Sequence, residues 1–408
     1  MTTTGMERTV DIYESLGVKK CVNGAGLLTR LGGSLMAPEV LDAMRDAAGA
    51  FVDMADLQTR ASEVIARHTG AEAGIVTSGG AAAITLATAA CLTRLDITRM
   101  ERLPDTEGMP NEVIMFRAHR TGYDHAIRAA GARIVEVGFN DRAAGSGVRG
   151  LEGWEIEAAI GPKTAAIGYA ANPTRQPSLA AVAAVARKHN LPVIVDAAAQ
   201  LPPKSNLKYF IAQGASLVAY SGGKAIRGPQ GTGILCGEKE LVAAALIQQL
   251  DMDILIETWA PPVGLLDGFF KDRLPHHGLG RGFKVDKESI AGLLVALERF
   301  TSADDVGDNA RREAQLEALL KLIPNLRHTR PTLLSAAMTK RYPILEIQFD
   351  EPALGFDAAE ISRRLQRQPT PVHLGERRLQ EGILLVDASG LRPGDEQTIA
   401  KALDAALK

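Results

Sequence analysis

Between about Ala71 and Gly237, short apolar segments typical of β-strands alternate with alanine-rich segments typical of helices. The apolar segments are AGIVTSGG, EVIMFRAH, ARIVEVG, TAAIGYAANP, PVIVDAAAQ and ASLVAYSGG. Strands that alternate with helices form a parallel or mostly parallel sheet covered on both faces. The nearly uninterrupted apolar run of PVIVDA fits a strand that is buried on both sides. This part of the chain therefore predicts an α/β domain.

The pattern changes after about Arg281. KESIAGLLVALERF predicts a long helix, and YPILEIQFD alternates like a half-exposed strand. GILLVDAS predicts a second strand, and a terminal helix closes the chain. We interpret this part as a smaller α+β domain that the N-terminal segment completes. The predicted division is a large domain over residues 46–290 and a small domain made of residues 1–45 and 291–408.

Composition excludes several classes of partner. The 408 residues contain 46 Lys and Arg against 48 Asp and Glu, a formal charge of −2 that argues against nucleic acid or an anionic membrane. The three scattered cysteines suit a reducing compartment and show no metal-ligand spacing. The N-terminus is polar and no run of about 18 apolar residues occurs. We expect a cytoplasmic protein with no membrane span and no bound metal.

Three polar features lie at the ends of predicted strands. TSGGAAA, at 77–83, is a turn of small residues that opens a helix, and its free N–H groups suit a phosphate. Asp196 ends the strand PVIVD, and Lys224 follows the strand of ASLVAYSGG. Each has an ordinary alternative, as a turn, a helix cap or a solvated lysine. Because ligands of open α/β sheets bind at the carboxyl ends of the strands, the three together indicate one site.

A phosphate cradle, a carboxylate and a lysine are the groups that pyridoxal phosphate requires. The lysine amine condenses with the aldehyde as a Schiff base. The carboxylate keeps the pyridine nitrogen protonated, so that the ring can accept electrons. The glycines around Lys224 would let its turn pass close to the cofactor. Ser221, three residues earlier, is a candidate for contacting the phosphate.

SGGKAIRGPQGTGIL, VIVDAAAQLPP and VTSGGAAAITLA resemble the fold type I pyridoxal-phosphate enzymes. VNGAGLLTRLGGSLMAPEV, LPDTEGMPNEVIMFRAHRTGYDHAIRAAGA and GLGRGFKVDKESIAGLLVAL are similar to the selenocysteine synthase-like branch, especially its D-glucosaminate-6-phosphate ammonia-lyase group. The resemblance runs from about Asp11 to at least Phe300. It implies a large domain around a seven-stranded sheet, a small domain made from both termini, and an active site at a homodimer interface.

The resemblance also implies roles for individual residues. Lys224 would form the Schiff base, and Asp196 would pair with the pyridinium nitrogen. Contacts to the cofactor's phosphate are expected from Ser78, Gly79, Gly80 and Ser221. Asn172 is expected near the ring hydroxyl, His119 is the candidate for stacking on the ring, and Gln200 is a further cofactor contact.

Substrate contacts are expected from basic side chains, because a carboxylate or phosphate pairs well with the fork of an arginine. The candidates are Arg30, Arg281, His276 and His277. A surface ion pair is the ordinary alternative for each arginine.

The resulting expectation is a pyridoxal-phosphate lyase acting on a 2-amino-3-hydroxy acid derived from a sugar. It would give a 2-keto-3-deoxy acid and ammonia. Racemisation or retro-aldol cleavage with the same cofactor stays open. Transfer to seryl-tRNA is disfavoured, because only about twenty residues precede CVNGAG and they contain no basic cluster. A non-catalytic scaffold is disfavoured by the intact Lys224 and Asp196.

Overall fold

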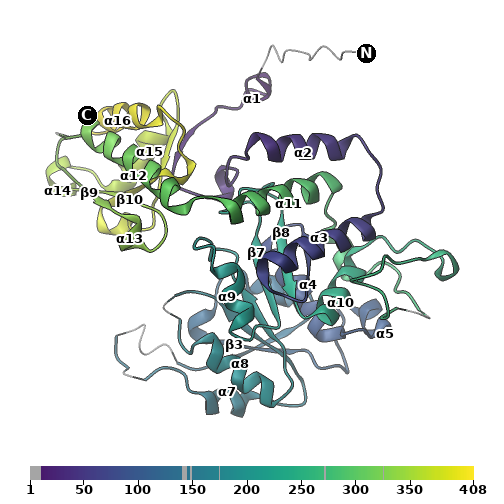
Figure 1. Cartoon of the computed structure of the whole chain (residues 1–408). Coiled ribbons are helices and arrows are strands. Elements are labelled where there is room, and N and C mark those ends of the chain that lie inside the picture. Colours follow the sequence, from purple (N-terminus) through teal and green to yellow (C-terminus); the bar gives the residue numbers. More distant parts are fainter. Residues whose placement is uncertain (1–10, 140–144, 148, 174, 271–272, 325) are drawn as a thin grey trace, which may run out of the picture. The chain divides into compact units, whose positions relative to one another are not determined.

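The computed structural model describes residues 11–139, 145–147, 149–173, 175–270, 273–324 and 326–408. The chain forms two compact units, which we describe separately (Figure 1). The larger unit is Met36–Ser302, and the smaller unit joins the chain up to Leu35 with Ala303–Lys408. The boundaries expected from sequence, at 45/46 and 290/291, fall inside helices α2 (Pro38–Ala48) and α11 (Lys287–Ser302).

Helices α2 and α11 run side by side, which is why both belong to the larger unit (Figure 1). Arg299 of α11 forms an ion pair with Glu39 of α2 at 2.7 Å. Gly292 faces Met44 so closely that a β-carbon would lie 2.7 Å from the methionine Cγ. The larger unit is thereby extended at both ends beyond the range expected from sequence.

A seven-stranded sheet forms the centre of the larger unit, in the order β2-β8-β7-β6-β5-β3-β4. Only β8 is antiparallel to its neighbours, so the predicted mostly parallel sheet is confirmed. The strands are β2 (Ala73–Thr77), β3 (Glu112–Phe116), β4 (Arg133–Val137), β5 (Thr164–Ala170), β6 (Val193–Asp196), β7 (Leu217–Ser221) and β8 (Gly233–Gly237).

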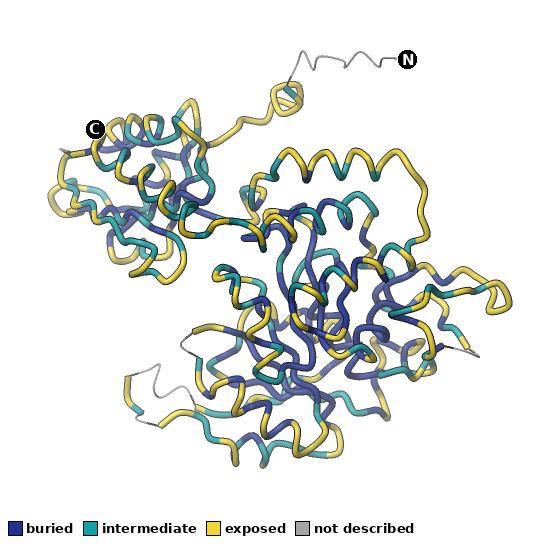
Figure 2. Tube along the Cα trace, viewed as in Figure 1, coloured by how far each residue is buried: buried dark blue, intermediate teal, exposed yellow. Residues whose placement is uncertain are grey.

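Helices cover this sheet and bury its central strands (Figure 2). Helix α4 (Gly80–Thr93) packs against β5, β6, β7 and β8, and it is buried from Ala82 to Thr93 because small side chains let it lie close to the strands. The other helices of this unit are α3 (Met54–Thr69), α5 (Ile97–Arg102), α6 (Asp124–Ala129), α7 (Gly153–Ala159), α8 (Leu179–Lys188), α9 (Asn206–Ala212) and α10 (Lys239–Gln249).

The smaller unit contains the antiparallel sheet β12-β10-β9 and the parallel pair β1–β11. Strand β10 alternates as predicted, with Leu345, Ile347 and Phe349 buried. The pair β1–β11 joins the N-terminal segment to the C-terminal part, so both termini build this unit. Its elements are α1 (Ile12–Ser15), β1 (Val22–Gly24), α12 (Asp305–Leu322), β9 (Thr329–Leu334), α13 (Ala336–Thr339), β10 (Ile344–Phe349), α14 (Glu351–Leu354), α15 (Ala358–Gln366), β11 (Val372–Leu374), β12 (Ile383–Asp387) and α16 (Asp395–Ala406).

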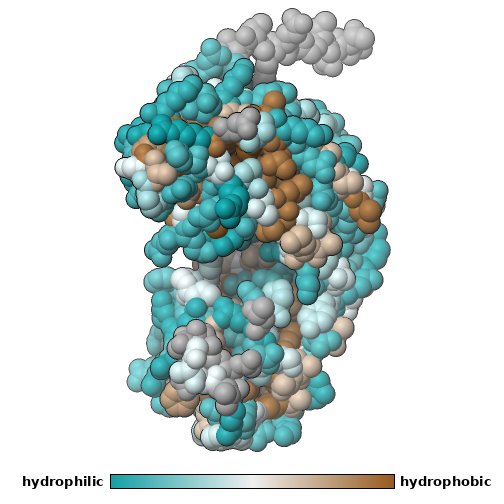
Figure 3. Space-filling model, turned by 90° about the vertical axis from the view of Figure 1, so that its left-hand side faces the viewer, coloured by the Kyte–Doolittle hydropathy of each residue, from teal (hydrophilic) through white to brown (hydrophobic). Residues whose placement is uncertain are grey.

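The face of the molecule in Figure 3 is mainly hydrophilic, with apolar residues gathered in smaller areas. Within the described residues, every helix is too short or too polar to cross a membrane.

Candidate functional site

The carboxyl ends of neighbouring strands bring the predicted site residues to one edge of the large sheet. Thr77 at the end of β2 and Ser221 at the end of β7 both pair with Gly233 of β8. Asp196 at the end of β6 pairs with Ala219 of β7 and Ala170 of β5. The segments that follow β2 and β7 therefore start at one level of the sheet, and those that follow β5 and β6 start at the level of Ala219, two residues earlier in β7.

The turn after β2 has the form of an anion cradle. Gly79 caps helix α4 with a φ of 103°, a conformation that favours glycine, and a β-carbon there would meet no atom within 4 Å. Since the first N–H groups of a helix have no acceptor within it, the start of α4 offers donors to a phosphate. Gly233 lies directly beside this turn, because its β-carbon would come within 2.5 Å of the Gly79 carbonyl carbon.

The segment that carries Asp196 approaches the same turn. A β-carbon on Gly80 would lie 3.1 Å from the β-carbon of Ala198, and the Ala198 N–H donates to Asp196 Oδ1 at 3.0 Å. Burial raises the pKa of Asp196, while the Ala198 N–H and the charge of Lys224 oppose the rise. The carboxylate thus lies near Lys224 in a poorly hydrated place, where a cationic partner would stabilise it.

The glycines beside Lys224 are packed against the chain that leads into β8. A β-carbon on Gly222 would lie 2.2 Å from the Thr232 hydroxyl, and one on Gly223 would lie 2.6 Å from the Gln230 α-carbon. The Gly222 N–H donates to the Thr232 carbonyl at 2.9 Å. These glycines let the chain between β7 and β8, which carries Lys224, fold back on itself.

The remaining predicted cofactor contacts lie at or just beyond the ends of the same strands. Ser78 and Ser221 are half-buried at the ends of β2 and β7. Asn172 is exposed just beyond β5, directly after Ala171, whose N–H donates to the Asp196 carbonyl at 2.9 Å. Gln200 is half-buried, and its carbonyl accepts from the Asn206 side chain at 2.7 Å.

His119 lies beyond β3, in a short 3-10 turn, and its side chain is fully buried. The ring stands edge-on to Phe116 and Tyr169, with centroids 4.9 and 4.7 Å away. Its Nε2 lies 3.3 Å from the Gln176 carbonyl, which can only accept, so Nε2 carries the proton. Burial and the charge of Arg175 lower the pKa of His119 to about 4, so the ring is neutral at neutral pH. Stacking on the cofactor would require one face to open, and it stays a prediction.

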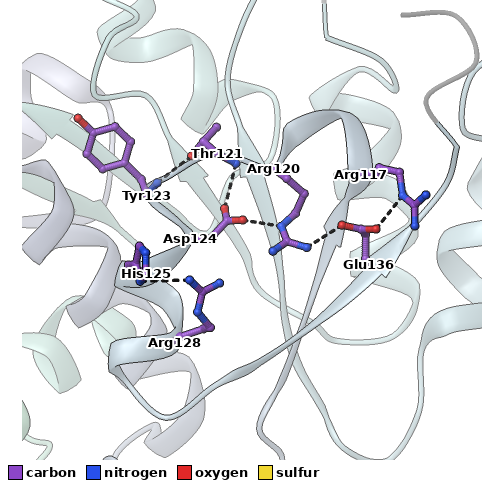
Figure 4. A network of polar contacts seen from close by, with 8 residues as sticks. All are labelled: Arg117, Arg120, Thr121, Tyr123, Asp124, His125, Arg128 and Glu136. Atoms are coloured by element: carbon purple, nitrogen blue, oxygen red, sulfur yellow. Dashed lines mark hydrogen bonds and ion pairs between the residues drawn. The ribbon is translucent and has the colours of Figure 1, made fainter. Parts of the chain in front are cut away.

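The loop after His119 is held by charges (Figure 4). Arg120 lies between Asp124, at 2.5 Å, and Glu136 of β4, at 2.6 Å. Arg117 contacts the other oxygen of Glu136 at 2.7 Å. This network fixes the wall of a pocket of about 20 Å³, roughly one water molecule. Its lining includes Thr121, Tyr123, Asp124, Tyr169 and Asp196.

Arg175 is a basic residue at this edge that the sequence analysis did not select. It follows β5 in the segment YAANPTRQP, and it is half-buried. Its Nε is buried and has no hydrogen-bond partner among the described residues. The signal in the sequence was its place three residues after Asn172, within a segment that had already been assigned to the site.

Three of the four predicted substrate contacts have partners elsewhere in the chain. Arg281 forms an ion pair with Asp251 at 2.9 Å, and His276 contacts Glu101 at 3.2 Å. His277 is exposed next to it. In the smaller unit, Arg30 lies 3.8 Å from Glu376 and 3.5 Å from the His373 ring. The ion pairs and hydrogen bonds described here for Arg30, Arg281 and His276 do not include Asp196, and the roles of all four residues in substrate binding stay predictions.

The residues at this edge fit pyridoxal phosphate. The turn at Gly79 has room for a phosphate, and Asp196 is a buried carboxylate of raised pKa that a pyridinium would stabilise. The buried Nδ1 of His119 has no partner among the described residues and can accept a hydrogen bond. Lys224 would bind the aldehyde carbon. The large sheet with these groups at its carboxyl edge is the fold of the fold type I pyridoxal-phosphate enzymes.

Comparison with known proteins defines the family. The model of the SelA family, L-seryl-tRNA selenium transferase, matches residues 20–257, and the chain belongs to this family. The D-glucosaminate-6-phosphate ammonia lyase of Salmonella typhimurium is 31% identical over 97% of both chains. A 5'-C-glycyluridine monooxygenase-decarboxylase of a Streptomyces species is 30% identical over 97% of this chain and 92% of its own.

A solved structure of an enzyme with the same name as the Salmonella relative is also similar to this chain. The structure of D-glucosaminate-6-phosphate ammonia-lyase superposes with a TM-score of 0.81 at 30% identity and covers 98% of both chains. An alanine–glyoxylate aminotransferase from Nostoc, at 16% identity and a TM-score of 0.55, shares the fold alone. The family implies pyridoxal phosphate as the cofactor, in agreement with the sequence-based prediction.

Proposed function

We propose that the protein is a pyridoxal-phosphate ammonia-lyase that acts on a 2-amino-3-hydroxy acid derived from an amino sugar. The observation that carries the proposal is the full-length similarity to D-glucosaminate-6-phosphate ammonia-lyase in both sequence and structure. The arrangement of Lys224, Asp196 and the turn at Gly79 supports it, because an elimination needs a base, an electron sink and a fixed cofactor.

Each residue of the site would have its own role in the elimination. Bound pyridoxal phosphate supplies a ring that accepts the electrons of the substrate's α-carbon–hydrogen bond. Lys224 Nζ, released from its covalent link by the substrate amine, would take the α-proton. Asp196 would hold a proton on the ring nitrogen, since a carboxylate beside it favours the charged form. Ser78, Gly79, Gly80 and Ser221 would bind the phosphate. The β-hydroxyl would leave as a water molecule. A second water molecule would be consumed when the product is hydrolysed to the keto acid and ammonia.

The products test this function. Purified protein supplied with pyridoxal phosphate should convert D-glucosaminate 6-phosphate into ammonia and a 2-keto-3-deoxy acid in equal amounts. The same yield is expected without oxygen, which separates a lyase from the monooxygenase named for the Streptomyces relative. Release of an aldehyde, or inversion of the α-carbon alone, would contradict the lyase and leave only the cofactor assignment.

The cofactor link has a test that does not depend on turnover. Borohydride reduction of the loaded protein followed by peptide mass analysis should place a pyridoxyl group on Lys224. Lys204→Gln should leave the label in place, because Lys204 Nζ contacts the Thr301 carbonyl at 3.3 Å. Labelling of Lys204, Lys163 or Lys188 in the wild-type protein would refute the assignment.

A further inference from the structure

Arg175 is half-buried beside the site, and one of its donors, Nε, is enclosed. Its Nε is buried and without a hydrogen-bond partner, and none of the described carboxylates forms an ion pair with it. A guanidinium carries five N–H donors. Burying an N–H donor without a hydrogen-bond partner costs free energy, so an acceptor beside Nε would be favoured, and an anion most of all because the group is charged.

The neighbours of Arg175 show where an anion bound to it would lie. The two residues that follow Arg175 contact the site: the Gln176 carbonyl lies 3.3 Å from His119 Nε2, and the Pro177 carbonyl accepts from the Tyr169 hydroxyl at 3.2 Å. Tyr169 lies on β5 and lines the same small pocket as Asp196. Arg175 therefore lies near the carboxylate expected to hold the cofactor ring, at the carboxyl edge of the sheet.

We propose that Arg175 binds the α-carboxylate of the amino acid substrate. This inference rests on the proposed function, which places the substrate amine at the cofactor. The α-carboxylate is two bonds from that amine, whereas the phosphate of a glucosaminate 6-phosphate is at the other end of the carbon chain. The anionic group nearest the ring is thus the carboxylate, and the planar fork of an arginine binds a carboxylate with two parallel hydrogen bonds.

Binding to a protein that cannot turn over separates this role from catalysis. Lys224→Gln loaded with pyridoxal phosphate is titrated by calorimetry with D-glucosaminate 6-phosphate, D-glucosaminate and glucosamine 6-phosphate. The first two carry the carboxylate, and the third carries only the phosphate. Adding Arg175→Gln should weaken binding of the first two by roughly 10- to 100-fold, the range for a hydrogen-bonded charge. Binding of glucosamine 6-phosphate should not change.

Two further variants complete the design. Arg187→Gln removes an exposed arginine from α8 and should leave all three affinities unchanged. Arg175→Lys keeps the charge but loses the fork, so it should bind the carboxylates with intermediate affinity. Equal weakening of glucosamine 6-phosphate would assign Arg175 to the phosphate, and loss of cofactor would assign it to the cofactor. Either of these two results overturns the proposal. Unchanged affinities in the Arg175→Gln variant, or a Lys224→Gln protein that does not bind the carboxylate ligands, would also overturn it. These binding measurements do not depend on turnover, so they can be interpreted even if the assay for ammonia and the 2-keto-3-deoxy acid fails.

Discussion

At the scale of single residues, Asp196 shows how a functional group can cost stability. Its pKa is raised because it is buried, with the Ala198 N–H and Lys224 opposing the rise. An acid whose pKa is raised on folding destabilises the folded state at pH values above the raised pKa, since the unfolded chain ionises more readily. As the pH falls towards the ordinary value of 3.8, the folded carboxyl takes up its proton and this cost disappears.

Asp196→Asn should therefore stabilise the cofactor-free protein. The amide oxygen can still accept from the Ala198 N–H, while the buried charge is gone. Melting temperatures measured without cofactor should be higher than wild type at pH 7, and the difference should shrink as the pH is lowered towards 4. Asp105→Asn is the matched control: hydrogen bonds from Glu107 and Arg102 lower the pKa of Asp105, so that variant should be no more stable than wild type. An Asp196→Asn variant no more stable at pH 7 would contradict the burial argument.

The same variant should lose activity. A carboxylate about 4 Å from a pyridinium is worth up to roughly 4 kcal/mol at an effective dielectric of about 20. Turnover should fall by roughly a hundred- to a thousand-fold while cofactor still binds. Turnover near the wild-type level would show that Asp196 does not hold the ring nitrogen.

At the scale of elements, the strands were predictable because each is a short apolar run that ends at a polar or small residue. Strands β2 and β6 and the helix that opens at Gly80 are where the sequence places them. Strand β8 was not predicted, because GTGILCG gives only a few apolar residues between glycines. The tight fold at Gly222 and Gly223 returns the chain antiparallel to β7, and the pairing of β8 with β2, about 160 residues earlier, is a long-range contact with no local pattern.

The site residues also divide into those visible in the local sequence and those that depend on packing. Asp196, Lys224 and the turn at Gly79 were assigned to the site because strand ends are visible in sequence. Arg175 was not selected, because only packing shows that its Nε is buried without a hydrogen-bond partner. Arg281 and His276 were selected for their charge, and the structure gives both a carboxylate within the same chain. A basic side chain in a sequence does not indicate which acid it will meet.

At the scale of the whole molecule, shared active sites would explain why Arg281, a predicted substrate contact, pairs with Asp251 and has no described contact with Asp196. Its segment, Leu279–Phe283, packs against α4 and α10, and the guanidinium pairs with Asp251. In a symmetric dimer each subunit could offer this segment to the partner's site. The homodimer with shared sites stays a prediction, and mixing two inactive variants tests it.

Lys224→Gln and Arg281→Gln should each be nearly inactive alone and should regain activity when their subunits are exchanged. In an equal mixture half of the dimers are mixed, and each mixed dimer has one site with both residues intact, so about a quarter of wild-type activity should return. Lys224→Gln mixed with Asp196→Asn is the control, because both residues belong to the same chain's site and no activity should return. Differently tagged subunits verify the exchange. If mixed dimers form but remain inactive, Arg281 acts within its own subunit or has no part in the site.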